Sequence, residues 1–327
     1  TVSGTSISFG TAVVFESATT QNLAATFDSN AGKTVVAYTS GSSSGKAVVG
    51  TVSGTSISFG TAATFESANM SETAIVFDSD ENKIVIAYKD IGNSNQGTAI
   101  VGTVSGTSIS FGSSVEFEGG NTTYISATYD SANGKVVLSF VDESDGSKGK
   151  ARVGTVSGTS ISFGSEVTFN NANTVFTSIT YDSNAGKVLI AFRDAGNSNY
   201  GTGIVGTVSG TSISFGSETV FESARSDYIV SAYDSSANKV VIVYADDGNS
   251  DYITSVVATV SGTSVSFGDP VVISNSAVTN PIGVAYSPDS NKTFVTYQDG
   301  SNNNYGAYAI GTVSGTSISF TSSAYWA

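Results

Sequence analysis

One phrase recurs at nearly constant spacing along the 327-residue chain and limits what the chain can fold into. It reads TVSGTS, then Ile or Val, then Ser-Phe, and its copies begin at residues 1, 51, 103, 155, 207, 259 and 312. Successive copies start 50, 52, 52, 52, 52 and 53 residues apart. A regular period near fifty residues is typical of proteins built from one repeated supersecondary unit. We therefore expect residues 1–327 to form a single repeat domain.

Each period contains four candidate strands separated by turn residues. In the fourth period the strand runs are rich in Val, Ile, Thr and aromatic residues, as β-strands are. They cover residues 176–182, 188–192, 203–208 and 211–215. The Ser-Gly of the phrase predicts a tight hairpin in which Gly supplies a positive φ. No segment keeps a helical 3.6-residue periodicity, so almost no helix is expected.

Four antiparallel strands in about 52 residues, repeated six times, predict an all-β fold, a six-bladed β-propeller. Runs such as VVAY, IVIAY and VVLSF are apolar throughout, as expected for blades buried on both faces. Inner strands should start near residues 22, 72, 124, 176, 228 and 281. The alternative architecture is a β-solenoid.

Seven copies of the phrase serve six blades, so one terminal copy should close the ring. We expect residues 1–18 on the outer edge of the last blade. Residues 316–327 then form either the terminal closing strand or a tail, and they compete for the same edge.

Loop lengths divide the connections into two classes. The spacing between the first-strand and second-strand aromatics is always 11 residues, and the phrase has a constant length. Lengths vary only between the second and third strands (the B–C loop) and between the fourth strand and the next first strand (the D–A connection). In an antiparallel meander these two connections leave the sheet at the same end. One face is therefore diversified, and loops on a rigid scaffold are typical binding sites. The alternative is drift in exposed loops.

Composition excludes several classes of function. The net charge is −14, which argues against nucleic acid and anionic lipid as partners. No apolar run is long enough for membrane insertion. The chain contains no Cys and no His, which removes thiolate chemistry and the usual general base. We predict no metal, no cofactor and no enzyme activity, because the repeated acids provide no singular pair of unlike carboxylates such as a glycosidase needs.

The B–C loops and the segments before the inner strands carry the candidate binding residues. Carboxylates, amides and aromatic rings suit the hydroxyls and the apolar face of a sugar ring, although Asp and Asn also cap their own turns, and we favour that interpretation for Asp. For the tyrosines of the loops, which no turn requires, a ligand or interface contact is favoured. Arg193 and Arg225 are isolated cations that could anchor an anionic group. The candidates are Asp90, Asn93, Asn95, Asp142, Asp194, Asn197, Asn199, Tyr200, Asp246, Asn249, Tyr252, Asp299, Asn302 and Tyr305 from the loops, and Tyr124, Phe176, Arg225 and Tyr228 from the other segments.

The turn between the first and second strands pairs an Asp with a Lys in the first five repeats, as in Asp28 and Lys33. The sixth repeat keeps Lys292 but reads SPDSNK. A ring of such carboxylates could bind Ca²⁺. An Asx-type turn with a local ion pair is the simpler interpretation, and we favour it.

The phrases AIVGTVSGTSISFG (99–112) and DAGNSNYGTGIVGTVSGTSISFG (194–216) resemble repeats of large structural and tail-fibre-type proteins of marine bacteriophages. The resemblance covers nearly the whole chain and brings no catalytic residue with it. It implies an extracellular or virion-surface location and contact with a cell-surface glycan or protein receptor, with other fibre or virion subunits as further partners. We therefore expect a non-enzymatic recognition or adhesion module. The alternative is a structural spacer of a viral fibre or surface layer, and a carbohydrate-active enzyme is a third reading.

Overall fold

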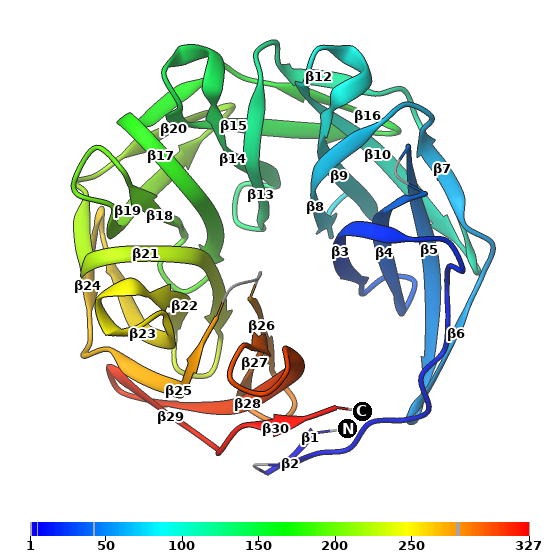
Figure 1. Ribbon diagram of the computed structural model, residues 1–327. Coiled ribbons are helices and arrows are strands. Elements are labelled where there is room, and N and C mark those ends of the chain that lie inside the picture. The colour runs from blue at the N-terminus through cyan, green and yellow to red at the C-terminus, as the bar shows by residue number, and fades with distance from the viewer. Residues whose placement is uncertain (1, 5, 42, 279–281, 327) are drawn as a thin grey trace. The chain divides into compact units, whose positions relative to one another are not determined.

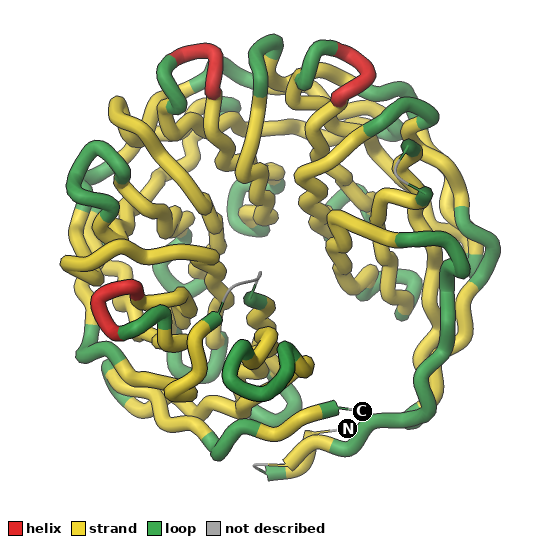
Figure 2. The backbone as a smooth tube through the Cα atoms, viewed as in Figure 1, coloured by secondary structure: helices red, strands yellow, loops and turns green. Residues whose placement is uncertain are grey.

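A computed structural model describes residues 2–4, 6–41, 43–278 and 282–326. The expected inner-strand start near residue 281 lies outside these residues. The described chain is all-β, with 68% of its residues in strands and almost no helix, as predicted (Figure 2). Its helical segments are three single 3₁₀ turns, Ile91–Asn93, Glu143–Asp145 and Asp247–Asn249. None of the described helices is long or apolar enough to cross a membrane.

The chain divides into two compact units, which are described separately. The first comprises residues 8–168 and 209–213. The second comprises residues 2–7, 169–208 and 214 onward.

The first unit contains three antiparallel meanders of four strands, here called A to D in chain order (Figure 1). A short fifth strand after D pairs with strand C in the first two of them. The strands are β3 (Thr20–Asp28), β4 (Lys33–Ser40), β5 (Ser44–Ser53), β6 (Ser56–Phe59) and β7 (Ala63–Glu66); β8 (Met70–Asp78), β9 (Lys83–Asp90), β10 (Gln96–Ser105), β11 (Ser108–Phe111) and β12 (Val115–Glu118); and β13 (Thr122–Asp130), β14 (Lys135–Asp142), β15 (Lys148–Ser157) and β16 (Ser160–Phe163).

The second unit repeats the pattern with strands β17 to β30, although β17, β19 and β20 have residues in both units. The strands are β17 (Val167–Asp182), β18 (Lys187–Asp194), β19 (Tyr200–Ser209) and β20 (Ser212–Phe215); β21 (Thr219–Asp234), β22 (Lys239–Asp246), β23 (Tyr252–Ser261), β24 (Ser264–Phe267) and β25 (Val271–Ala277); and β26 (Gly283–Ser287), β27 (Lys292–Asp299), β28 (Tyr305–Ser314), β29 (Ser317–Phe320) and β30 (Ala324–Tyr325). Four-stranded antiparallel sheets of this kind fit a β-propeller-like fold.

The terminal copies of the phrase differ from the expectation. Strand β29, from the last copy, pairs with β28 as the outer strand of the last meander. The first copy forms a separate hairpin in which β1 (Val2–Ser3) pairs with β2 (Ser6–Ile7). Among the described strands, the outer edge that we expected residues 1–18 to occupy therefore belongs to β29.

The apolar runs are buried on both faces, as predicted. In β9, every residue from Ile84 to Tyr88 is at most 1% exposed. Odd and even positions of this strand lie in different clusters, because Val85 packs with Leu138 of the following repeat and Ile86 packs with Val35 of the preceding one. Sheets stacked in this way remove alternation from the strand sequence.

Two glycines explain why the phrase is nearly unchanged from repeat to repeat. The first lies in the hairpin, where Gly106 has φ +62° and, with Thr107, connects β10 to β11. The second directly follows the phrase, and a Cβ placed on Gly60 would lie 1.9 Å from the carbonyl oxygen of Thr107 in the next repeat. The same backbone approach recurs at Gly10–Thr55, Gly112–Thr159 and Gly164–Thr211 in the first unit and at Gly216–Thr263 and Gly268–Thr316 in the second. Each of the first six copies must therefore keep both its shape and the glycine that follows it, whereas Thr321 follows the last copy.

The A–B turns confirm the Asx geometry but not the ion pair. Asp130 Oδ1 accepts hydrogen bonds from the backbone N–H of Ala132 and Asn133, both at 3.1 Å. Lys33 instead donates to Thr51 Oγ1 at 2.9 Å. The predicted Asp–Lys ion pair is absent from the described A–B turns, because backbone N–H groups already engage the carboxylates.

Candidate functional site

The B–C loop and the D–A connection meet at one end of each sheet, as their lengths predicted. Gly92 N–H, in the B–C loop of the second repeat, donates to Asn69 O in the connection before strand A at 3.1 Å. The loop also reaches the following repeat, since Thr122 N–H donates to Asn95 O at 3.1 Å. Equivalent bonds occur in the second unit, such as Ser226 N–H to Asn199 O at 3.3 Å. We call this end of the sheets the variable end.

The five candidate aspartates of the B–C loops serve the backbone. They are between 3% and 9% exposed: Asp90, Asp142, Asp194, Asp246 and Asp299. Asp194 Oδ1, for example, accepts from the N–H groups of Gly196 and Asn197 at 3.0 and 3.2 Å. Four of the five make such bonds, which fits turn capping. At Asp246, burial, followed by the charge of Glu222, raises the pKa of the carboxyl.

The asparagines and tyrosines of these loops lie closer to solvent. Asn93, Asn197 and Asn249 are exposed, whereas Asn95, Asn199 and Asn302 are half-buried. Tyr200 and Tyr252 are also half-buried, and Tyr305 is 57% exposed. Tyr200 faces Arg225 in the pairing of β19 with β21, so the loop tyrosine and the connection arginine are neighbours.

The first strand (A) of each of the first five repeats contains a bulge near the point where it starts to pair with strand B. These strands are β3, β8, β13, β17 and β21. The pairing of β21 with β22 shifts register between Asp227 and Val230, and Tyr228 inside the bulge has φ +54°. A positive φ is uncommon for bulky residues and costs about 1–3 kcal/mol, so such residues often mark functional positions. The bulge residues are Asn22, Glu72, Tyr124, Phe176 and Tyr228, with φ between 50° and 55°. The backbone strain is thus constant while the side chain changes.

In the second unit the bulges bring aromatic rings together with charged side chains. The rings of Phe176 and Tyr228 lie 5.1 Å apart at 48°. Above the Phe176 ring, the Arg193 guanidinium carbon is 5.0 Å from the centroid, which is a cation–π distance. Arg193 also pairs with Asp227, and Arg225 pairs with the same carboxylate through Nη2 at 3.0 Å. We call these five residues the aromatic–guanidinium cluster.

The charges around this cluster nearly balance. Hydrogen bonding to Asp227 raises the pKa of Arg225, and Asp247 and Asp251 act in the same direction. Burial and the charge of Asp247 raise the pKa of Asp251. Two guanidinium groups thus face three carboxylates. The Arg225 side chain is 51% exposed, whereas those of Arg193 and Asp227 are 12% and 15% exposed. The arrangement offers ring faces, donors and acceptors without an excess of positive charge.

The first unit holds a different arrangement at equivalent positions. Here Tyr124 N–H donates to Glu72 Oε2 at 3.1 Å, so the bulges of two successive repeats touch. Burial raises the pKa of Glu72. The structure therefore brings Phe176, Tyr228 and Arg225 of the predicted residues into one cluster in the second unit. In the first unit, Tyr124 contacts Glu72.

Sequence reasoning missed a second feature of the variable end. It is a Glu that directly follows a Phe in the D–A connection, as in Phe65-Glu66 and Phe221-Glu222. Glu66 Oε2 accepts a hydrogen bond from the buried Tyr88 hydroxyl at 3.0 Å, and Glu222 accepts from Tyr244 at 3.1 Å. Burial raises the pKa of these tyrosines. The signal was present as a constant spacing of 22 residues between the Glu and the Tyr.

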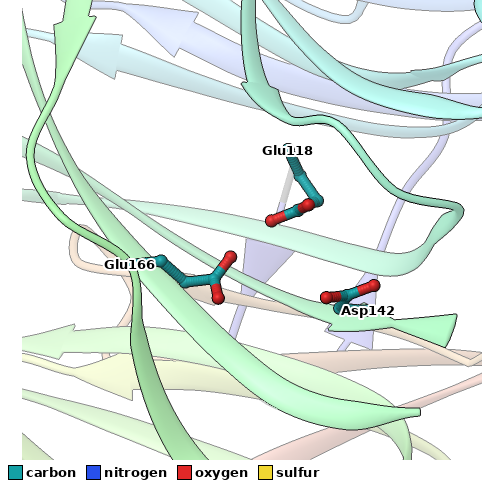
Figure 3. A group of neighbouring side chains, drawn as sticks. All are labelled: Glu118, Asp142 and Glu166. Carbon is teal, nitrogen blue, oxygen red and sulfur yellow. The ribbon is translucent and has the colours of Figure 1, made fainter. Parts of the chain in front are cut away.

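The third repeat breaks this pairing and builds a carboxylate cluster instead (Figure 3). Phe140 stands in place of the tyrosine, so Glu118 has no phenol to accept from. Glu118, Asp142 and Glu166 place carboxylate oxygens within 4.8 Å of one another. Lys150 Nζ lies 2.5 Å from Glu166 and 3.8 Å from Asp142, and it offsets part of the negative charge.

Two carboxyls of this cluster have unlike environments. Burial, followed by the hydrogen bond with Glu166, raises the pKa of Glu118 to about 7. Burial would also raise the pKa of Glu166, but the hydrogen bonds with Glu118 and Lys150 lower it. The expectation that the repeated acids contain no such unlike pair was therefore wrong. It failed because a Tyr-to-Phe change at one repeat alters the partner of an acid 22 residues earlier.

Comparisons with known proteins indicate the fold. No family model and no curated protein matches the chain. Among solved structures, AofleA from Arthrobotrys oligospora is similar with a TM-score of 0.54 and 11% identity, over 92% of this chain and 86% of that one. A form of AofleA in which three evenly spaced arginines are replaced by alanine aligns with a TM-score of 0.55. A protein of unknown function from Dyadobacter fermentans has a TM-score of 0.57 and 11% identity, over 94% of each chain. At this identity the likeness shows a shared fold.

Proposed function

We propose that this protein is a non-enzymatic recognition module that binds a cell-surface glycan through the variable end of its sheets. The observation that carries the proposal is the aromatic–guanidinium cluster. Two rings at strained bulge positions lie beside an arginine pair that shares one carboxylate. Backbone strain kept at a position whose side chain varies is expected where the side chain has a binding role.

The chemistry of the cluster suits an uncharged sugar ring. An aromatic face packs against the apolar face of a pyranose, and the Asp227 and Arg225 groups supply an acceptor and donors for its hydroxyls. An anionic sugar is less suited, because three carboxylates outnumber two guanidinium groups there. A small aromatic site with a few oriented polar groups is the usual composition of a ligand site.

The finer architecture is also a proposal. We infer a six-bladed propeller ring closed by a terminal strand, supported by the repeated four-strand meanders and by the solved structures of similar fold. The phrase resemblance to phage tail-fibre-type proteins supports an extracellular or virion-surface location, with fibre or virion subunits as further partners. A protein receptor would use the same variable end. A structural spacer is the alternative function and predicts no affinity for sugars.

The test is a broad glycan array with purified protein and two matched variants. In the first, Phe176→Ala and Tyr228→Ala remove the two rings. In the second, Tyr305→Ala removes an exposed tyrosine outside the cluster. We expect a neutral-glycan signal that falls about fivefold to tenfold in the first variant and is unchanged in the second. Glycan binding that survives loss of both rings would place the site elsewhere, and no glycan binding would favour a protein receptor or the spacer.

A further inference from the structure

A pocket of about 320 Å³ lies at the end of the sheets opposite the variable end, where the connections have constant length. It is lined by the A–B turns of the fifth and sixth repeats and by the hairpin between β28 and β29. The side chains that matter here are Asp234, Ser236, Lys239, Asn291, Lys292 and Thr312. All of them belong to the second unit. We call this the turn pocket.

The two lysines of the turn pocket have no carboxylate partner. Lys239 lies directly opposite Asp234 in the pairing of β21 with β22, and Lys292 lies opposite Ser287 in the next repeat. Neither lysine side chain takes part in an ion pair or hydrogen bond within the described part of the chain. Both lysines are half-buried.

The carboxylate that would balance the second lysine is missing from the sequence. The first five A–B turns each carry an Asp at this position: Asp28, Asp78, Asp130, Asp182 and Asp234. The sixth has Ser287, and its only acid, Asp289, is exposed and does not line the pocket. Asp234 Oδ1 is occupied by the N–H groups of Ser236 and Ala237 at 3.0 and 2.9 Å. The turn pocket therefore holds two positive charges against one engaged negative charge.

Neutral donors complete the lining. Asn291 Oδ1 accepts the Tyr286 hydroxyl at 3.1 Å, which leaves the amide N–H₂ of Asn291 as a donor. Ser236 and Thr312 contribute hydroxyl groups. Ammonium, amide and hydroxyl donors together match an acceptor-rich anion, and lysine is a common ligand of phosphate-like groups.

We propose that the turn pocket is a binding site for a compact oxyanion, a sulfate or phosphate group. The proposal does not depend on sugar binding at the variable end, because the two sites lie at opposite ends of the strands and share no residue. The group could arrive as a free ion or as an ester on a larger molecule, and both present the same tetrahedral set of acceptor oxygens.

Calorimetric titration of the full chain tests the proposal with three probes at constant ionic strength: inorganic sulfate, inorganic phosphate and a monosaccharide sulfate ester. The variant Ser287→Asp restores the carboxylate that the other repeats carry while leaving both lysines in place. We expect oxyanion binding to the wild type that weakens about tenfold or more in Ser287→Asp and in the double variant Lys239→Gln, Lys292→Gln. Tighter binding of the ester than of inorganic sulfate would identify a sulfated ligand, and the reverse order would identify a free ion.

The matched control is Lys187→Gln, because Lys187 occupies the same turn position in a repeat that keeps its own Asp182. This variant should bind the oxyanion as the wild type does. Thermal unfolding of every variant without ligand checks that the fold is retained. The proposal is overturned if the wild type binds none of the three probes, or if Ser287→Asp and the double lysine variant bind as tightly as the wild type.

Discussion

Two positions in the repeat obey different constraints. The glycine directly after strand D lies so close to the hairpin of the next repeat that a single Cβ would overlap a backbone carbonyl, as at Gly60 and Thr107. At the variable end, the bulge residue has a strained backbone but its side chain ranges from Asn22 to Phe176. The glycine position therefore keeps its residue type because of a backbone contact. The bulge position keeps only its backbone shape, and its side chain varies among the repeats.

The largest expected effect comes from breaking the fixed contact. In Gly112→Ala the new Cβ would lie 1.9 Å from Thr159 O, and the backbone of one repeat must move. Overpacking against backbone, with no flexible side chain to yield, should lower the free energy of unfolding by about 3 kcal/mol or more. Chemical denaturation of the variant and the wild type measures this loss.

The control for that substitution is already present in the chain. Thr321 follows the last copy of the phrase, where the other copies are followed by glycine. Its Oγ1 accepts a hydrogen bond from Ile310 N–H at 3.1 Å. Thr321→Gly should change stability by less than about 1 kcal/mol, since it removes one hydrogen bond of the outer strand. If Gly112→Ala were equally mild, the backbone contact would not be the reason for the fixed glycine.

The next effect tests the variable end through pH. The pKa of Glu118 is raised to about 7 in the folded protein from an ordinary value of 4.5, so the folded state binds more protons between these values. The resulting stability is fully present below pH 4.5 and is lost as pH rises toward 7. Because Glu118 is partly exposed, solvent screening reduces the effect to about 1 kcal/mol. The lowered pKa of Glu166 acts below pH 4.5, outside this window.

Denaturation between pH 5 and pH 8 checks this prediction. The variant Glu118→Gln keeps a donor for Glu166 and has no titrating group, so it should lack this pH dependence and exceed the wild type in stability at pH 8. Parallel pH curves for the two proteins would mean that Glu118 titrates as an ordinary carboxyl.

The strands were predictable from the sequence, whereas the contacts between repeats were not. Runs such as that of β9 are apolar on both faces and end at turn residues, so local pattern alone located them. The Gly60–Thr107 approach joins residues of different repeats and leaves no local pattern except the Gly that follows the first six copies of the phrase. The bulge also leaves no sequence pattern, because it is only a shift in strand pairing. Residues as different as Glu72 and Tyr124 occupy it.

The candidate site was predictable in part for the same reason. Variation in length and composition pointed to the end of the sheets that holds the aromatic–guanidinium cluster, and the predicted residues included Phe176, Tyr228 and Arg225 of that cluster. It also included the loop aspartates, whose carboxylates turn toward their own backbone N–H groups. A single sequence cannot separate these two uses of an Asp, because turn capping and ligand binding both favour a short side chain with acceptor oxygens.

A smaller effect should follow from exchanging Tyr and Phe at the equivalent positions 88 and 140. Tyr88→Phe deletes the hydroxyl that donates to Glu66 and should cost about 1 kcal/mol. Phe140→Tyr supplies the missing hydroxyl to Glu118, and it should lower the pKa of that carboxyl and weaken the pH dependence described above. Denaturation at two pH values measures both effects, and an unchanged pH dependence in Phe140→Tyr would show that the phenol does not reach Glu118.

The smallest effect separates two reasons why a position can favour glycine, namely lack of space for a Cβ and a positive φ. At Gly112 the backbone is ordinary and space is the constraint, whereas at Tyr228 a φ of +54° is the constraint. Tyr228→Gly and Tyr228→Ala both lose the contact with Phe176, but only Ala keeps the strain of a Cβ at positive φ. The Gly variant should therefore be more stable than the Ala variant by about 1 kcal/mol, the reverse of the usual order in a strand. Equal stability, or a more stable Ala variant, would mean that the bulge relaxes when its side chain is removed, and the variable end would then owe its shape to the side chain.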